Sequence, residues 1–250
     1  MRPPKAILFI GVLCFWAAGW QPGFTAGPAS QMFDAEGVRI HYLAQGTGEP
    51  VVLIHGLDSS AAINWELPGT LAEVARDHQA IALDLPGYGQ SDKPGEDSAY
   101  GARWVEDVIL LLDHLNIRKA HIVGYSMGGL VALKLIAAHP DRALSATLGG
   151  MGWMPEGGVL QKVWAHMQSP SARGVSQLAL SEAEVKAIRV PTLIVVGDRD
   201  AVQKLYVAPL RALRKDWPVI EIQDAGHLDC IYKQQFKDAI VQWINTNRER

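Results

Sequence analysis

The sequence predicts an α/β fold in which a mostly parallel sheet carries helices on both faces. Short runs rich in Val, Ile and Leu alternate with longer segments whose apolar residues recur at helical spacing. Most of the short runs are predominantly apolar, as expected of strands buried on both faces. One of them ends at Val123 and leads through a sharp glycine-containing turn into an apolar helix. In such sheets the functional residues collect beyond the carboxyl ends of the strands.

Each expected strand is bounded by turn-forming residues. Two short runs at 31–34 and 38–44 are separated by Glu36-Gly37, which predicts a hairpin. The remaining strands are expected at 51–54, 80–83, 120–123, 144–148, 191–196 and 219–222.

The helices are expected between these strands, at 63–76, 104–115, 126–138, 202–214 and 232–245. The first of them would carry Leu67, Leu71 and Val74 on one apolar face. His139-Pro140 ends the third helix, because the residue before a proline disfavours helical geometry.

A secretory signal peptide is expected at residues 1–29. Arg2 and Lys5 precede an uncharged apolar run at 6–20, and small residues follow it. That run is shorter than the ~20 residues of a spanning helix, and an uncleaved anchor is the alternative. We therefore expect an exported protein, periplasmic or secreted, that meets a membrane only if this segment is retained.

The mature chain, residues 30–250, is expected to be one globular domain. Of the 250 residues 48% are hydrophobic and 20% charged, which suffices for a full core. Without the leader, 21 basic and 26 acidic residues leave a formal charge of −5, which disfavours a nucleic-acid partner. Cys230 is then the only cysteine, so no internal disulfide forms; we interpret it as a small buried thiol rather than a redox switch. We expect a monomer or a weak homo-oligomer that acts on a small molecule.

The turn after Val123 reads Gly124-Tyr125-Ser126-Met127-Gly128 and fits the pattern G-x-S-x-G. A serine between a strand and a helix in this pattern adopts a strained backbone conformation that exposes its hydroxyl, and the flanking glycines let strand and helix approach. An ordinary helix N-cap is the alternative interpretation of Ser126. The strand–turn–helix context favours Ser126 as a nucleophile.

A serine hydroxyl needs a base, and the base needs a carboxylate that fixes its tautomer. His227 follows the last expected strand in a glycine-led loop, and Asp200 and Asp198 follow the strand before it. We prefer Asp200, which lies further into the loop, and assign Asp198 to a turn or helix cap. Apart from His55, which is considered below, the other histidines are interpreted as structural or solvated. His121 lies inside a strand, His41 lies in the hairpin, and four lie on helix or turn surfaces: His78, His114, His139 and His166.

An oxyanion intermediate needs two N–H donors aimed at the developing charge. The backbone N–H of Met127 follows the nucleophile directly, and that of Leu57 lies in the loop after the 51–54 strand. We expect these two groups to form the oxyanion hole. His55 is interpreted as a residue that shapes this loop by hydrogen bonding, and Asp84 as a turn former.

Taken together, these residues resemble the α/β-hydrolase fold family from about Gln31 to Trp243. The resemblance implies an eight-stranded sheet, a Ser–Asp–His triad, and neither a cofactor nor a metal. A serine nucleophile argues against the family's epoxide hydrolases and haloalkane dehalogenases, which use aspartate there. The matching segments are His55-Gly56, Asp84-x-Pro86-Gly87-x-Gly89-x-Ser91, Gly124-Tyr125-Ser126-Met127-Gly128-Gly129, Pro191 to Asp200 and Gly226-His227.

The chain departs from the family at about residues 151–188, where the resemblance implies a helical lid and only a short one fits. A helix around Val159 to Met167, a break at 170–174 and a capping box at Ser181-x-x-Glu184 are expected. Substrate selectivity in the family comes largely from this lid, so a short one implies an open site. Candidate walls of a substrate pocket are aromatic or sulfur-containing, although core packing explains them equally well: Met151, Trp153, Met154 and Trp164.

The function expected from the sequence is that of a serine hydrolase cleaving carboxylic esters of small or medium acyl groups. Other chemistries use the same triad: C–C bond hydrolysis, lactone hydrolysis, acyl transfer and perhydrolysis. A non-catalytic ligand-binding module on this scaffold is the alternative from a different class.

Overall fold

The computed structural model describes residues 27–249. The predicted signal peptide lies outside these residues except for its last three positions. Within the described part of the chain, no helix is long and apolar enough to cross a membrane.

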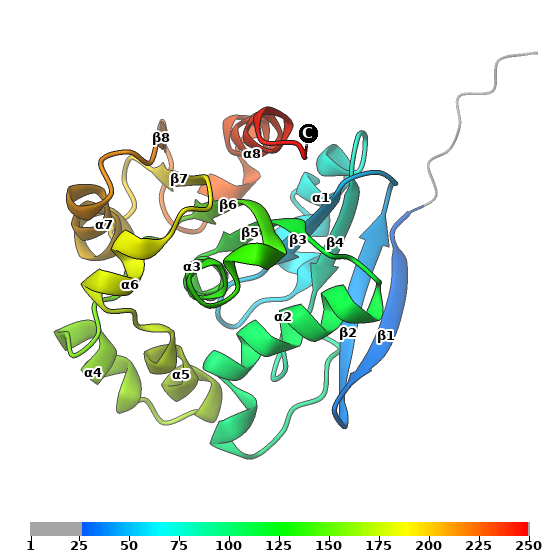
Figure 1. Ribbon diagram of the computed structural model, residues 1–250, viewed down its shortest axis with the longest axis horizontal. Helices are drawn as coiled ribbons and strands as arrows, with labels where there is room; N and C mark the ends of the chain where they lie inside the picture. The colour runs from blue at the N-terminus through cyan, green and yellow to red at the C-terminus, as the bar shows by residue number, and fades with distance from the viewer. Residues whose placement is uncertain (1–26, 250) are drawn as a thin grey trace, which may run out of the picture.

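An eight-stranded sheet forms the centre of the described chain, with strand order β1-β2-β4-β3-β5-β6-β7-β8 (Figure 1). β1 pairs antiparallel with β2, as the hairpin prediction required, and β2 pairs antiparallel with β4. All later pairings are parallel, so the predicted fold class is confirmed. The strands are β1 (Ala29–Ala35), β2 (Val38–Gln45), β3 (Pro50–Ile54), β4 (Gln79–Leu83), β5 (Ala120–Tyr125), β6 (Ala143–Gly149), β7 (Thr192–Gly197) and β8 (Val219–Ile222).

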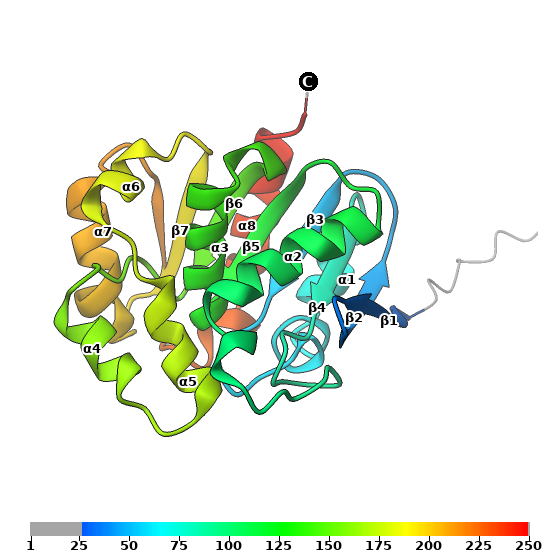
Figure 2. The same ribbon diagram turned by 60° about the horizontal axis from the view of Figure 1, so that its bottom comes forward.

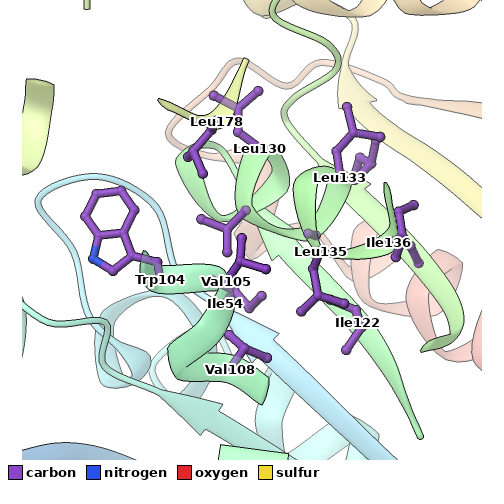
Figure 3. Close-up of a cluster of buried hydrophobic side chains, with 14 of the residues drawn as sticks. Ile54, Trp104, Val105, Val108, Ile122, Leu130, Leu133, Leu135, Ile136 and Leu178 are labelled. Carbon is purple, nitrogen blue, oxygen red and sulfur yellow. The ribbon is translucent and has the colours of Figure 1, made fainter. Parts of the chain in front are cut away.

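Helices cover both faces of this sheet, and Figure 2 shows α2 and α3 in front of it with α8 behind. Alternate residues of β3 supply the two cores: Val52 and Ile54 face one, Val51 and Leu53 the other. The α2 and α3 side is shown in Figure 3, where Leu130, Leu133 and Val108 pack among other buried side chains. The helices are α1 (Thr70–Val74), α2 (Ala102–His114), α3 (Met127–Ala138), α4 (Val159–Ala165), α5 (Pro170–Gly174), α6 (Glu182–Ala187), α7 (Ala208–Leu213) and α8 (Gln234–Thr246).

The helix predicted at 63–76 is wrong as a single element. A wide helical turn at Ala62–Glu66 is separated from α1 by Pro68-Gly69, where Gly69 takes a left-handed φ of 84°. Leu67 consequently lies at the bend and is 72% exposed instead of facing the core with Leu71. The helix predicted at 202–214 is present without a break: a wide helical turn at Gln203–Val207 continues directly into α7, which ends at Leu213.

The segment between β6 and β7 contains three short helices, α4, α5 and α6. The capping box at Ser181 and Glu184 is present at the start of α6, as predicted. The predicted break at 170–174 is wrong: Pro170 occupies the first turn of α5, and the Ser169 hydroxyl accepts a hydrogen bond from the Ala172 N–H. Proline is compatible with that position because the first N–H groups of a helix have no intrahelical acceptor.

Two glycines allow α3 to approach the sheet closely. A Cβ atom added at Gly124 would lie 2.0 Å from the Gly128 carbonyl oxygen, and one at Gly128 would lie 2.2 Å from the Ile54 carbonyl oxygen. Both obstacles are backbone atoms, which cannot rotate away. The glycines of the motif are therefore required by the contact of α3 with β3 and β5.

We expect Gly128→Ala to destabilise the protein, because the added methyl group would push α3 away from β3. Overpacking of this kind typically costs about 1–3 kcal/mol. Urea denaturation measures the loss, with Gly95→Ala as the control because a Cβ at Gly95 meets no atom within 4 Å. Equal stability of the two variants would contradict the close approach.

A buried carboxyl group on α2 makes the stability of the fold depend on pH. Asp107 is buried; one carboxyl oxygen accepts from Arg103 Nε at 2.9 Å, and within residues 27–249 the other has no hydrogen-bond partner. Burial raises the pKa of Asp107 to about 7, only partly offset by the Arg103 charge. The folded protein thus retains a proton that the unfolded chain releases near its ordinary pKa.

Because the folded pKa lies above the unfolded one, the stabilising contribution is present at low pH and is lost as pH rises from about 4 to 7. We expect the wild type to lose on the order of a few kcal/mol across this range relative to Asp107→Asn. Urea denaturation at a series of pH values measures the difference. Asp113→Asn, which alters an exposed acid of the same helix, should leave the pH slope unchanged.

Candidate active site

Ser126 lies at the junction of β5 and α3, where its backbone is held at φ 53° and ψ −122°. A left-handed φ is unfavourable for a serine and is maintained here by the surrounding structure. The Ser126 N–H donates to the Gly149 carbonyl at 2.8 Å, and its carbonyl accepts from Gly129. The strand–turn–helix geometry expected from G-x-S-x-G is therefore present.

Ser126, His227 and Asp200 form one chain of hydrogen bonds. His227 Nε2 lies 2.9 Å from Ser126 Oγ, and His227 Nδ1 lies 2.7 Å from Asp200 Oδ2. Asp200 is buried, and its other carboxyl oxygen accepts from the Val202 N–H at 2.9 Å. A carboxylate fixed in this way favours the tautomer in which Nδ1 carries the proton and Nε2 accepts from serine.

Asp198 takes a different place from Asp200. Its two carboxyl oxygens accept the backbone N–H groups of Asp224 and Ala225, at 3.1 and 3.0 Å. It therefore ties the loop after β7 to the loop after β8 and does not reach the imidazole. Its position is that of the turn cap expected from the sequence.

The two expected oxyanion donors lie on either side of Ser126. Gly56 packs against the serine, since a Cβ added there would lie 3.1 Å from Ser126 Cβ. The Gly56 N–H donates to Asn64 Oδ1 at 2.8 Å. Within residues 27–249 the N–H groups of Leu57 and Met127 donate to no other group. Met127 is also the first residue of α3, whose dipole favours negative charge at this end.

His55 shapes the loop that carries Leu57. Its Nδ1 hydrogen-bonds the Gly56 carbonyl at 2.7 Å, and its Nε2 accepts from the Leu85 N–H at 3.0 Å. An Nε2 that accepts a hydrogen bond carries no proton, so these two bonds require a neutral ring. Burial lowers the pKa of His55, which favours the same form. His55 thereby holds the loop after β3 against the loop after β4.

Asp84 organises the neighbouring loop, as its assignment as a turn former predicted. It is buried and accepts from the N–H groups of Ala61 and Gln90 at 2.7 and 2.8 Å, and it pairs with His41 Nδ1 at 2.9 Å. The expectation that His78 lies at the surface is wrong. Its ring is buried where α8 packs, with Nε2 3.1 Å from Asn245 Oδ1.

Sequence reasoning missed Tyr125. Its ring stacks on the His227 imidazole, with centroids 5.7 Å apart, and its hydroxyl donates to the His227 carbonyl at 2.5 Å. The period of two along β5 offers a signal, because it places Tyr125 with Val123 on the face that packs against α8. Tyr125 thereby supports the loop that carries His227. The imidazole of His227 in turn faces Ser126, the residue that follows Tyr125 in the chain.

Cys230 is buried three residues after His227, in agreement with its interpretation as a structural thiol. Burial raises the pKa of this thiol to about 12, and the nearby carboxylates of Asp200 and Asp229 act in the same direction. A thiol with such a pKa is protonated and unreactive at neutral pH.

A cavity of about 350 Å³ opens beside Ser126 and His227. The candidate walls proposed from the sequence do not line it. Met151 and Trp153 are buried in the core, and the Trp153 N–H donates to the Leu180 carbonyl, while Trp164 donates to the Tyr206 hydroxyl. The lining residues are Gly56, Leu57, Asp58, Ser59, Ile63, Asn64, Tyr125, Ser126, His227, Leu228, Ile231 and Tyr232.

Comparison with known proteins agrees with this geometry. Residues 49–177 match the family model described as alpha/beta hydrolase fold. A 2-hydroxymuconate semialdehyde hydrolase of Pseudomonas sp. (strain CF600) is 30% identical over 236 residues, covering 84% of this chain and 81% of that protein. The chain belongs to the α/β-hydrolase fold family. It is a hydrolase on this fold.

Solved structures show the same fold. A variant of the meta-cleavage product hydrolase from Pseudomonas fluorescens IP01 superposes with a TM-score of 0.70 at 25% identity, covering 87% of this chain and 98% of that one. The enol-lactonase from Burkholderia xenovorans LB400 gives a TM-score of 0.69 at 22% identity, covering 86% of this chain and 100% of that one.

Within residues 27–249 of this α/β-hydrolase, no three His, Cys, Asp or Glu side chains are grouped as a metal site.

The two acids near β7 are distinguished by substitution. We expect Asp200→Asn to slow fluorophosphonate labelling of Ser126 by roughly 10²–10⁴-fold, because the amide no longer fixes the tautomer of His227. Asp198→Asn should mainly lower the midpoint of thermal unfolding, because it weakens the tie between two loops. Labelling rates and unfolding curves of both variants measure this, and a reversed pattern would assign the acid to Asp198.

Proposed function

We propose that this protein hydrolyses carboxylic esters through an acyl-enzyme intermediate. The hydrogen-bonded chain from Asp200 through His227 to Ser126 carries the proposal. It couples a hydroxyl in a strained, exposed turn to a base whose other nitrogen is held by a buried carboxylate. Such a chain has the parts needed to activate a serine for acyl transfer.

In the first half-reaction, Ser126 Oγ bonds to the ester carbonyl carbon while His227 Nε2 takes the hydroxyl proton. The carbonyl oxygen becomes an oxyanion, within reach of the N–H groups of Leu57 and Met127. As the oxyanion collapses, the bond to the alcohol oxygen breaks and His227 returns its proton to that oxygen. Water then attacks the acyl-enzyme in the same way, and the acid leaves with Ser126 restored.

An ester suits this set of residues because the leaving alcohol needs only the proton that His227 carries. The cavity is open, with Leu228 and Tyr232 exposed at its edge, so water can reach the acyl-enzyme. Cleavage of a C–C bond requires in addition that a proton be delivered to carbon. The three-residue chain alone supplies no separate donor for that step.

C–C bond hydrolysis is the second candidate, and the sequence relatives favour it. The relative from Pseudomonas sp. (strain CF600) is named for 2-hydroxymuconate semialdehyde, and the structural neighbour from Pseudomonas fluorescens for meta-cleavage products. Both reactions would use the same three residues for the acyl-transfer step. A direct comparison of a p-nitrophenyl ester with 2-hydroxymuconate semialdehyde, at matched concentrations, decides which is the better substrate.

We expect Ser126→Ala to abolish hydrolysis of p-nitrophenyl butyrate, because no other group in the cavity is coupled to His227. The loss should be at least roughly 10⁴-fold in kcat, with an unchanged circular dichroism spectrum. Absorbance of released p-nitrophenolate measures the rate. A variant that keeps the wild-type rate would exclude Ser126 as the nucleophile.

Labelling with a fluorophosphonate separates the enzyme from a non-catalytic binding module. The wild type should be labelled once, at Ser126, as determined by mass spectrometry of the digested protein. A chain that binds ligands without an activated serine would remain unlabelled.

A further inference from the structure

Three large apolar side chains are exposed at the cavity that contains Ser126. Ile63 is 50% exposed, Tyr232 48% and Leu228 85%, and all three line the cavity. Exposure of one such side chain is ordinary, but a group of them around a nucleophile favours contact with an apolar ligand. Ile231, which is buried, adds a further apolar side chain to the lining beside them.

The residues that line the same cavity carry a net negative charge. Its lining contains one carboxylate, Asp58, and no lysine or arginine. Asp58 is exposed and directly follows Leu57, with a left-handed φ of 50° that fixes its position at the mouth. Apart from His227, no lining residue can acquire a positive charge. An anionic ligand would therefore meet repulsion and no counter-charge.

We infer that the substrate is an uncharged ester whose apolar group lies among Ile63, Leu228 and Tyr232, and that Asp58 discriminates against substrates bearing a carboxylate. This inference rests on the proposed esterase function and specifies its substrate class. Selectivity is set by two segments, 56–64 and 227–232, and not by the helices between β6 and β7, none of whose residues line the cavity.

A second hollow is lined by cations but does not contain the nucleophile. It measures about 590 Å³ and is lined by Arg199, Lys204 and Asp200, without Ser126 or His227. Arg199 is already paired with Asp224. Because neither Ser126 nor His227 lines this hollow, a carboxylate attracted to Lys204 would bind outside the cavity that contains the serine.

The experiment compares two esters of equal length that differ in charge. p-Nitrophenyl pentanoate has a neutral acyl group, and mono-p-nitrophenyl glutarate ends in a carboxylate. We expect the wild type to prefer the neutral ester in kcat/KM by on the order of tenfold or more, since like charges a few ångströms apart at a solvent-exposed site repel to about this extent. Raising the salt concentration should reduce this preference in kcat/KM, because dissolved ions screen the repulsion.

Matched substitutions assign the effect to residues. Asp58→Asn, which tolerates the left-handed conformation, should reduce the preference severalfold by raising kcat/KM for the anionic ester. Glu66→Gln is the control, because this exposed acid lies two residues after the 56–64 segment and does not line the cavity. Ile63→Ser should raise KM for the neutral ester and weaken the dependence on acyl length, whereas Leu67→Ser, outside the cavity, should not.

Rates of fluorophosphonate labelling test the inferred charge preference independently of the proposed esterase function. An alkyl fluorophosphonate and its ω-carboxylate analogue report the charge preference of the site without turnover. If neither ester is hydrolysed, or Ser126→Ala hydrolyses both, the esterase proposal fails while the labelling ratio still tests the cavity. Equal or faster reaction of the anionic compounds, or a preference unaltered in Asp58→Asn, would overturn the inference.

Discussion

The backbone contact between the Ser126 turn and β3 is the constraint on which the rest of the site depends. Glycine at positions 124 and 128 lets α3 begin directly against β5 and the Ile54 carbonyl. Only at that separation does Ser126 take its left-handed φ and project its hydroxyl beyond the sheet. The same contact brings the loop after β3, with Leu57, beside the start of α3, so one packing requirement positions both the proposed nucleophile and the two proposed oxyanion donors.

Parallel pairing supplies the other two members of the triad. β7 and β8 are neighbours and run in the same direction, so the loops that carry Asp200 and His227 leave the sheet at the same edge. Asp198 joins these loops through two backbone hydrogen bonds, while Tyr125 supports the His227 loop from β5. The position of the His227 imidazole is thus fixed by Asp200 on one side and by Tyr125 of β5 on the other. These contacts orient the ring, which the loop alone does not do.

The features predictable from the sequence are those with a local physical signature. The strand at 219–222 and the helix after Ser126 are predicted at or near their observed bounds, because β-branched or apolar residues concentrate there and Pro218 or Gly128 stands near the start. The prediction of one helix at 63–76 is wrong because Leu67 fits the helical period of apolar residues, whereas Pro68-Gly69 interrupts the helix directly after it. Tyr125 and the cavity lining depend on which distant segments meet, as do the buried positions of Met151 and Trp153. Spacing along the chain does not contain that information.

The segment from His227 to Tyr232 links the proposed base to the proposed substrate contacts. His227 faces Ser126, Leu228 and Tyr232 form the exposed edge of the cavity, and Ile231 and Cys230 anchor the segment in the core. Any displacement of this segment therefore alters the position of the histidine and that of the apolar wall together. The facing segment at 56–64 likewise carries both Leu57 and Ile63. Under the proposed mechanism, each wall of the cavity would combine one group that acts on the reacting carbonyl with one that contacts the rest of the substrate. Binding an apolar group between these walls would then restrict the motion of the reacting groups themselves, so the fit of that group would determine kcat as well as KM.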